Sequence, residues 1–173
     1  MQTINLYGPP SVGKSMQSAF IFGKLKYLGH NAEMCSEYAK DLSWKKISIK
    51  EGGPTLQLEI FINQLKKEDL LKDKVDFMVT DSPLLLNAYY SQSELTKKIA
   101  MDRNSNKQFH FWLTRSNAKF EKEGRVHNEE ESRQIESQMK EYLQACGVDL
   151  IIVDCPIEDR ADWIINYVLN QQN

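Results

Sequence analysis

Short apolar runs alternate along the chain with longer stretches in which apolar residues recur at helical spacing. Strands that alternate with helices are typical of βαβ units and of a mainly parallel sheet. The apolar runs predict five strands, at residues 3–7, 32–36, 75–80, 108–114 and 149–153. The pattern therefore predicts an α/β fold. The length of 173 residues fits a single domain, which we expect to span residues 1–173.

Four stretches have the three- and four-residue apolar spacing of a helix, at residues 14–28, 56–71, about 135–143 and 157–169. In the first of them five small or apolar residues fall near one face, namely Met16, Ala19, Phe20, Gly23 and Tyr27. Gly29 is placed to end that helix. Asn128 and Glu131 have the spacing of a capping box at the start of the third helix.

Two segments interrupt the pattern. Gly52-Gly53-Pro54 is a break and a candidate hinge. Residues 116–127 are polar and highly charged, and they lie between a predicted strand and a predicted helix. They are either a mobile lid, which we place at about 116–128, or a solvated connection.

The strongest motif lies between the first strand and the first helix. Eight residues there match GxxxxGK[ST] in full: Gly8, Pro9, Pro10, Ser11, Val12, Gly13, Lys14 and Ser15. The two glycines let backbone N–H groups turn onto phosphate oxygens. Lys14 brings positive charge to the β- and γ-phosphates, and the hydroxyl of Ser15 is a ligand for Mg²⁺. The motif predicts a nucleoside triphosphate site, and the lack of an Asn-Lys-x-Asp motif favours ATP or a relaxed base preference.

Two carboxylates follow predicted strands, where ligands bind in an open parallel sheet. Asp81 follows the third strand, the place of a Walker-B-like aspartate that holds Mg²⁺. The alternative is an aspartate that caps the turn before Pro83. Glu37 follows the second strand, where it would face the γ-phosphate and accept a proton from an attacking hydroxyl. The alternative is a solvated glutamate in the first turn of a helix.

Positive charge around the γ-phosphate is a requirement of phosphoryl transfer. Arg115 ends the fourth strand and Arg125 lies in the charged segment, so both are candidate catalytic residues. The planar fork of an arginine suits this task because it binds two oxygens at once. Lys119 and Lys122 either assist or only keep the segment soluble.

Aromatic residues in four places are candidates for the wall of an acceptor site that stacks on a base: Tyr38, Trp44, Tyr89 and Tyr90. The alternative for each is a place in the core. Cys155-Pro156 follows the last strand, where the loop often lines the nucleotide base in this architecture.

The net charge of the chain and its distribution limit the binding partners that we expect. The 22 Lys and Arg against 24 Asp and Glu give a net charge of −2, which excludes a uniformly basic DNA-coating protein. The charge is unevenly distributed, because residues 1–127 hold 19 basic and 14 acidic residues, and residues 128–173 hold 3 and 10. The positive part contains the phosphate loop, so DNA stays among the acceptors that the sequence allows.

Cysteine and histidine usage indicates a reducing cytoplasm without a disulfide framework or a zinc site, because Cys35, Cys146 and Cys155 form no CxxC pair. No apolar run is long enough to span a bilayer, and the first residues lack the features of a secretory signal. We therefore expect no membrane partner.

The phosphate loop, the TDSP after a strand and the WLTR…KF…EGR…EEES stretch together resemble the small P-loop kinases related to ribosylnicotinamide kinase. The resemblance is closest to phage-encoded members, some of which phosphorylate 5-hydroxymethyluracil in DNA. It implies a P-loop kinase three-layer sandwich, with a five-stranded parallel sheet in the order 2-3-1-4-5 and a lid after the fourth strand. By position it implies five catalytic residues: Lys14, Glu37, Asp81, Arg115 and Arg125.

The implied reaction is phosphoryl transfer from ATP, with Mg²⁺, to a hydroxyl of a nucleoside, a nucleotide or a hydroxymethylated pyrimidine in DNA. It would take place in the host cytoplasm if the chain is phage-encoded. Small kinases of this kind are often dimers, so a homodimer is an open alternative to a monomer.

One departure from the kinase pattern concerns the acceptor. Many nucleoside and nucleotide kinases have an Asp-Arg or Glu-Arg pair after the third strand, whereas here Ser82-Pro83 follows Asp81. An ordinary nucleoside monophosphate kinase would want such an arginine for the second phosphate. The competing hypotheses are a non-kinase P-loop ATPase or nucleotide-binding regulatory module, and a chance glycine-rich turn in a structural protein.

Overall fold

The five predicted strands form one sheet in which all neighbouring strands are parallel. The computed structural model describes residues 1–49, 51–104, 107–115 and 129–171, and of residues 129–133 it describes the backbone only. The strand order is β2-β3-β1-β4-β5, as the resemblance implies. The strands are β1 (Gln2–Tyr7), β2 (Ala32–Cys35), β3 (Phe77–Thr80), β4 (Gln108–Leu113) and β5 (Ile151–Val153). The α/β prediction and the strand order are therefore confirmed.

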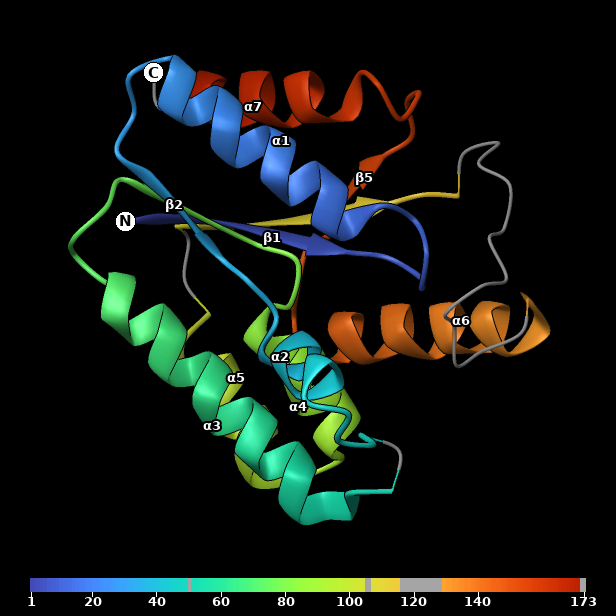
Figure 1. Ribbon diagram of the computed structural model, residues 1–173. Helices are drawn as coiled ribbons and strands as arrows, with labels where there is room; N and C mark the ends of the chain where they lie inside the picture. The colour runs from blue at the N-terminus through green and yellow to red at the C-terminus, as the bar shows by residue number, and fades with distance from the viewer. Residues whose placement is uncertain (50, 105–106, 116–128, 172–173) are drawn as a thin grey trace.

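Helices cover both faces of the sheet, which makes three layers (Figure 1). Helices α1 (Lys14–Tyr27) and α7 (Arg160–Asn170) pack side by side on one face. The opposite face carries α2 (Tyr38–Trp44), α3 (Gly53–Leu71), α4 (Leu84–Ser91), α5 (Glu94–Asp102) and α6 (Glu129–Ala145).

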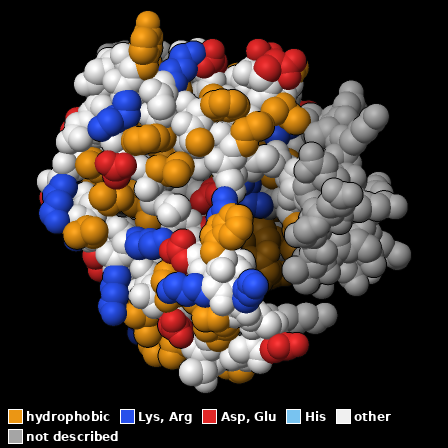
Figure 2. All heavy atoms as spheres, viewed as in Figure 1, with side chains coloured by type: hydrophobic (Ala, Val, Ile, Leu, Met, Phe, Trp, Pro, Cys, Tyr) orange, Lys and Arg blue, Asp and Glu red, His pale blue; other side chains and the backbone are white. Residues whose placement is uncertain are grey.

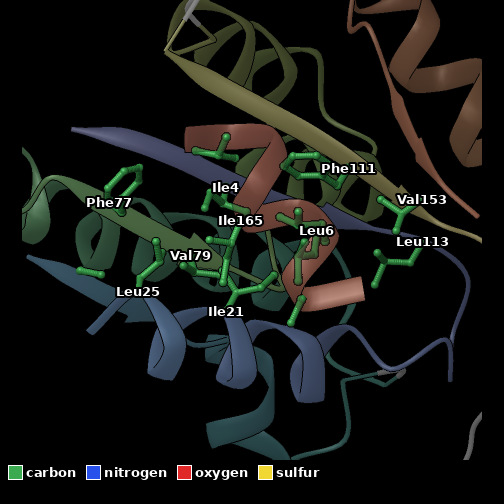
Figure 3. Close-up of a cluster of buried hydrophobic side chains, with 14 of the residues drawn as sticks. Ile4, Leu6, Ile21, Leu25, Phe77, Val79, Phe111, Leu113, Val153 and Ile165 are labelled. Carbon is green, nitrogen blue, oxygen red and sulfur yellow. The ribbon is translucent and has the colours of Figure 1, made fainter. Parts of the chain in front are cut away.

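Each face of the sheet has its own apolar core. Between the sheet and the α1/α7 layer, Ile4, Leu6 and Val79 of the strands meet Ile21 and Ile165 of the helices (Figure 3). On the other face, Tyr7, Trp112 and Met139 belong to a second cluster. Strands buried on both faces are continuous apolar runs in sequence, because no position faces water. This is why the short strand β3, with every residue buried, could be predicted.

Helix α1 turns a different face to the core from the one that its apolar residues suggest. Gln17, Ser18, Ile21 and Leu25 are buried. The face that carries Met16, Phe20 and Tyr27 is exposed, and Figure 2 shows hydrophobic side chains on the surface of this layer. The two polar residues are buried because each bonds within the fold: Ser18 donates to the carbonyl of Ser15 and Gln17 to that of Ile157.

The end of α1 is the one predicted. Gly29 has a φ of +88°, its N–H donates to the carbonyl of Lys26, and the N–H of His30 donates to that of Leu25. This pair of bonds is the Schellman motif, which needs a residue in the left-handed conformation after the helix.

Three short helices were not predicted, namely α2, α4 and α5. Helix α4 is nearly all buried over its first five residues, so its sequence has no amphipathic period to detect.

The predicted hinge at Gly52-Gly53-Pro54 is the start of α3, with the proline in the first turn where its missing N–H costs nothing. The capping residue Asn128 lies outside the described residues. In the described part of the chain, no helix combines the length and the apolar character of a membrane-spanning segment.

Candidate nucleotide and acceptor site

The phosphate loop joins the end of β1 to the start of α1, which is the arrangement that the motif requires. Gly8 has a φ of +143° and Gly13 a φ of +92°, and Ser11 between them has a φ of +78°. A Cβ at residue 8 would lie 2.7 Å from the carbonyl oxygen of Leu113, at the end of β4. The loop therefore needs glycine at residue 8 for its conformation and for the close approach of β4.

Lys14 is half-buried at the first position of α1, and its ammonium group folds back over the loop. The Nζ atom donates to the carbonyl oxygens of Gly8 at 2.8 Å and Pro9 at 3.1 Å. Burial lowers the pKa of Lys14 to about 8, although the negative charges of Glu37 and Asp81 act against this shift. The ammonium is thus held at the mouth of the loop by two neutral acceptors that an anion can replace.

Asp81 is the first residue after β3, and it is nearly buried. In the sheet Thr80 pairs with Asn5, so Asp81 lies beside the last residues of β1, just before the phosphate loop. The turn that follows is held by its own bonds: the N–H of Ser82 donates to Oγ1 of Thr80 at 3.1 Å, and Nδ2 of Asn87 donates to the carbonyl of Ser82 at 3.0 Å.

Glu37 precedes α2 at the capping position, but its side chain makes no capping hydrogen bond. It is half-buried. The pKa of Glu37 is raised by burial and by the charge of Asp81, and the charges of Lys14 and Lys40 partly offset this. The fold thus brings Glu37, Asp81 and Lys14 within electrostatic reach of one another, from three separate segments. The role of Glu37 as a proton acceptor stays a prediction.

A buried glutamine that sequence reasoning missed fixes the start of α2. Gln64 of α3 is fully buried, and its Oε1 accepts the N–H of Tyr38 at 3.1 Å while its Nε2 donates to Sγ of Cys35 at 3.3 Å. Tyr38 is the residue after Glu37, so these bonds hold the backbone that carries the carboxylate. The only signal in sequence is a polar residue within the apolar face of a helix.

Of the two arginines predicted from the sequence, Arg115 lies in the described part of the chain. Arg115 follows β4, and its Nε donates to Oε2 of Glu136 on α6 at 3.2 Å. The same glutamate accepts a bond from Lys140 at 3.2 Å. Arg125, Lys119 and Lys122, with the rest of the predicted lid, lie outside the described residues.

The four aromatic residues separate into different environments. Tyr90 of α4 is the one with an electrostatic link to the site: burial, Tyr89 and Glu37 raise its pKa to about 12. Tyr89 packs edge-on against Tyr142 of α6. Tyr38 donates to Glu59 at the surface, and Trp44 is 79% exposed. Tyr90 is therefore the aromatic candidate for contact with an acceptor.

The start of α7 also reaches the phosphate loop, through an arginine absent from the predicted set. Arg160 donates to carbonyl oxygens of Cys155, of Val12 in the loop and of Thr114 after β4. Cys155-Pro156 thus lies beside the donor side of the site. A shallow hollow lined by His30 and Asp76 lies at the opposite edge of the sheet, at the start of β1 and β3, away from every motif residue.

The oxygen donors of the site suit an ion that is held mostly by phosphates. Among the described residues no group of three or more His, Cys, Asp or Glu side chains is placed to hold a metal by itself. Ser15 is exposed in the first turn of α1 and Asp81 follows β3, which gives one hydroxyl and one carboxylate. Mg²⁺ in nucleotide sites commonly takes one or two protein oxygens, with phosphates and waters as its other ligands.

Three solved structures with the same architecture match nearly the whole length of this chain. The YorR protein of Bacillus subtilis, in complex with phosphorylated GDP, has a TM-score of 0.59 at 21% identity, and the match covers 98% of this chain and 97% of that one. Deoxyadenosine kinase from M. mycoides has a TM-score of 0.58 at 17% identity, over 98% and 99% of the two chains. Shikimate kinase from Acinetobacter baumannii has a TM-score of 0.58 at 12% identity, over 99% and 95%.

These likenesses establish the fold. A search of curated protein sequences finds no match. The family model described as an AAA domain matches residues 3–160, a span that begins in β1 and ends at the first residue of α7, and the chain belongs to this family of AAA domains.

Proposed function

We propose that the protein is a P-loop kinase that transfers a phosphoryl group from ATP to a hydroxyl of a nucleoside, a nucleotide or a hydroxymethylated pyrimidine in DNA. The observation that carries the proposal is a complete phosphate loop with Lys14 at its mouth, together with the carboxylates of Glu37 and Asp81 after two paired parallel strands of the same sheet. Two of the structures with this fold are kinases that act on small hydroxyl compounds, by the words of their names, and YorR binds a guanine nucleotide.

In the proposed reaction the phosphate loop binds the triphosphate through backbone N–H groups and the positive end of α1. Lys14 exchanges the carbonyls of Gly8 and Pro9 for oxygens of the β- and γ-phosphates. Ser15 and Asp81 would hold Mg²⁺, which neutralises charge on the phosphates when it is bound. Arg115 would exchange Glu136 for the transferring phosphate, with Arg125 as its companion.

Glu37 accepts the proton of the attacking hydroxyl. The oxygen of the acceptor forms its bond to the γ-phosphorus as the bond to the β-phosphate oxygen breaks, and ADP leaves. The raised pKa of Glu37 suits this work, because a base is effective when its pKa lies near the working pH.

A nucleoside is the acceptor that the described residues favour among the three. Of the arginines in the described part of the chain, Arg103 pairs with Asp69, Arg115 with Glu136, and Arg160 is buried against carbonyls. With Arg115 assigned to the transferring phosphate, no arginine among the described side chains is left to hold a second phosphate of the acceptor.

The test is a screen with γ-labelled ATP against nucleosides, nucleotides, shikimate and DNA that contains 5-hydroxymethyluracil. We expect label on a nucleoside, and label on DNA alone would support the resemblance to the kinases of 5-hydroxymethyluracil in DNA instead.

The second candidate function is a non-kinase ATPase, which the AAA-domain family description favours. It predicts slow hydrolysis that no acceptor changes, and this outcome with bound ATP would overturn the kinase proposal.

The pH profile of the reaction should have two informative limbs. Glu37 must be ionised to accept a proton and its pKa is raised, so kcat should fall at a pH above the ordinary glutamate range as the solution is acidified. Lys14 must be charged, and its pKa in the free protein is about 8, so kcat/KM for ATP should fall above about pH 8.

Glu37→Gln should lower kcat by about 100-fold or more and remove the acidic limb. Glu94→Gln is the matched control, because Glu94 is an exposed glutamate in the first turn of α5. If Glu37→Gln keeps both the rate and the acidic limb, Glu37 is not the base.

A further inference from the structure

Arg160 is a fully buried arginine at the first position of α7, and its guanidinium binds three backbone carbonyls. Its Nη1 donates to the carbonyl of Val12 at 3.1 Å, its Nη2 to that of Thr114 at 2.8 Å, and its Nε to that of Cys155 at 3.2 Å. These residues belong to the phosphate loop, the end of β4 and the loop after β5. One side chain thus ties together three segments that surround the donor side of the site.

The charge of this arginine is costly where it lies. Burial lowers its pKa, with a partial opposing effect from Cys155 and Asp154. The three hydrogen bonds of the guanidinium go to neutral carbonyls, which offset only part of the hydration that a buried cation loses. A methionine in its place would leave these three carbonyls without a donor and lower stability, yet holding them does not by itself require a charged side chain.

The direction of the peptide bond between Val12 and Gly13 links this arginine to the phosphate loop. In a planar trans peptide the C=O and the following N–H point in opposite directions. Because the carbonyl of Val12 accepts a hydrogen bond from Arg160, the N–H of Gly13 points away from Arg160. The guanidinium also polarises that peptide and adds positive charge behind the loop, which favours an anion in front of it.

We infer that Arg160 is a positioning residue of the donor site, which presets the phosphate loop to bind a triphosphate. The inference rests on the proposed function to the extent that the loop binds the donor. The inference adds a residue of α7, outside the phosphate-loop motif, to the donor site. Arg160 also links the phosphate loop to Thr114, the residue before Arg115. A second hydrogen bond also attaches the segment before α7 to α1, since Gln17 donates to the carbonyl of Ile157 at 2.7 Å. The effect of Arg160 on the phosphate loop can therefore be tested separately from the attachment of α7.

The test compares three variants of the full chain, with melting temperature and calorimetric dissociation constants for ATP and for inorganic tripolyphosphate. Arg160→Met removes the donors and the charge, and Arg160→Lys keeps the charge without the fork. Val168→Ala is the control, because Val168 is fully buried on the same helix within the α1/α7 core. All three should lower the melting temperature.

We expect Arg160→Met to weaken binding of both ligands by about tenfold or more, the effect of losing a charge-assisted hydrogen bond. Arg160→Lys should fall between it and the parent, and Val168→Ala should bind as the parent does. Parent-like affinity in both arginine variants would overturn the inference, and if Arg160→Met does not fold, the lysine variant decides.

The same measurements keep this inference apart from the proposed function. A parent protein that binds no tripolyphosphate would refute the donor site itself. A parent that binds tripolyphosphate and ATP but phosphorylates no acceptor would refute the kinase proposal, and the comparison of the arginine variants would still hold.

Discussion

Lys14→Ala is expected to abolish measurable phosphoryl transfer. The ammonium of Lys14 is the cation that the structure places at the mouth of the phosphate loop, held there by the carbonyls of Gly8 and Pro9. Removing one preorganised donor from developing charge costs about 100- to 1000-fold in kcat. Binding of ATP should weaken as well, because the charge also meets the ground-state triphosphate.

Lys24→Ala is the matched control, since Lys24 lies in the same helix and its partner is Asp162 on α7, away from the loop. A surface ion pair of this kind contributes little, so this variant should keep its activity and melt close to the parent. Steady-state rates and ATP dissociation constants for the two variants test the prediction. Equal activity in Lys14→Ala and the parent would remove the phosphate loop from the reaction and revive the chance-turn hypothesis.

The sheet could be predicted because its central strands are almost wholly buried. A run such as the one in β3, with every residue buried, stands out from the helices around it. The short helices could not be found in the same way. Helix α4 is buried nearly all round at its start, and α2 has seven residues, fewer than two full periods of a helical pattern.

The site was partly predictable for a topological reason. Residues directly after parallel strands lie at one edge of the sheet, so Glu37 and Asp81 could be singled out from the sequence. Gln64 and Arg160 could not, because their roles come from backbone groups far away in sequence: Arg160 reaches a carbonyl 148 residues earlier in the chain. Nothing local distinguishes them from an ordinary polar residue of a helix.

The face of α1 shows the reverse error. Its small and apolar residues at positions such as Met16 and Phe20 suggest a buried stripe, yet the buried face includes Gln17 and Ser18. One hydrogen bond from each side chain offsets part of the cost of burial, from Gln17 to the carbonyl of Ile157 and from Ser18 to that of Ser15 in the same helix. Near a binding loop, the helix direction is set by the loop and the sheet, and the apolar pattern follows only in part.

Gly8→Ala is expected to reduce both stability and ATP binding, because two separate costs coincide at this residue. A φ of +143° is a conformation that an L-residue with a Cβ resists, at about 1–3 kcal/mol. The added carbon would lie 2.7 Å from the carbonyl oxygen of Leu113 and 2.9 Å from Cγ1 of Val12. The side chain of Val12 can rotate, but the carbonyl belongs to a buried strand, so the loop must move.

That movement should lower kcat/KM for ATP by about 100-fold, since catalytic groups misplaced by about 1 Å cost rates of that order. Two other glycines separate the causes. Gly29→Ala introduces strain alone, at a φ of +88° with nothing within 4 Å of the new carbon, and should lower the melting temperature while leaving kcat/KM unchanged. Gly23→Ala lies inside α1 facing open space and should raise stability by about 1 kcal/mol.

The order expected in thermal unfolding is therefore Gly23→Ala above the parent, then Gly29→Ala, then Gly8→Ala, with ATP kinetics altered in the last alone. This order follows if the close approach of β4 holds the loop in its binding shape. A Gly8→Ala protein that is as destabilised as Gly29→Ala but binds ATP normally would mean that strain is the whole effect and that the contact with Leu113 is incidental to binding. The carbonyl of Thr114, the residue after Leu113, accepts a hydrogen bond from Arg160. In that case the shape of the phosphate loop and the position of the end of β4 would be set independently at these two adjacent residues.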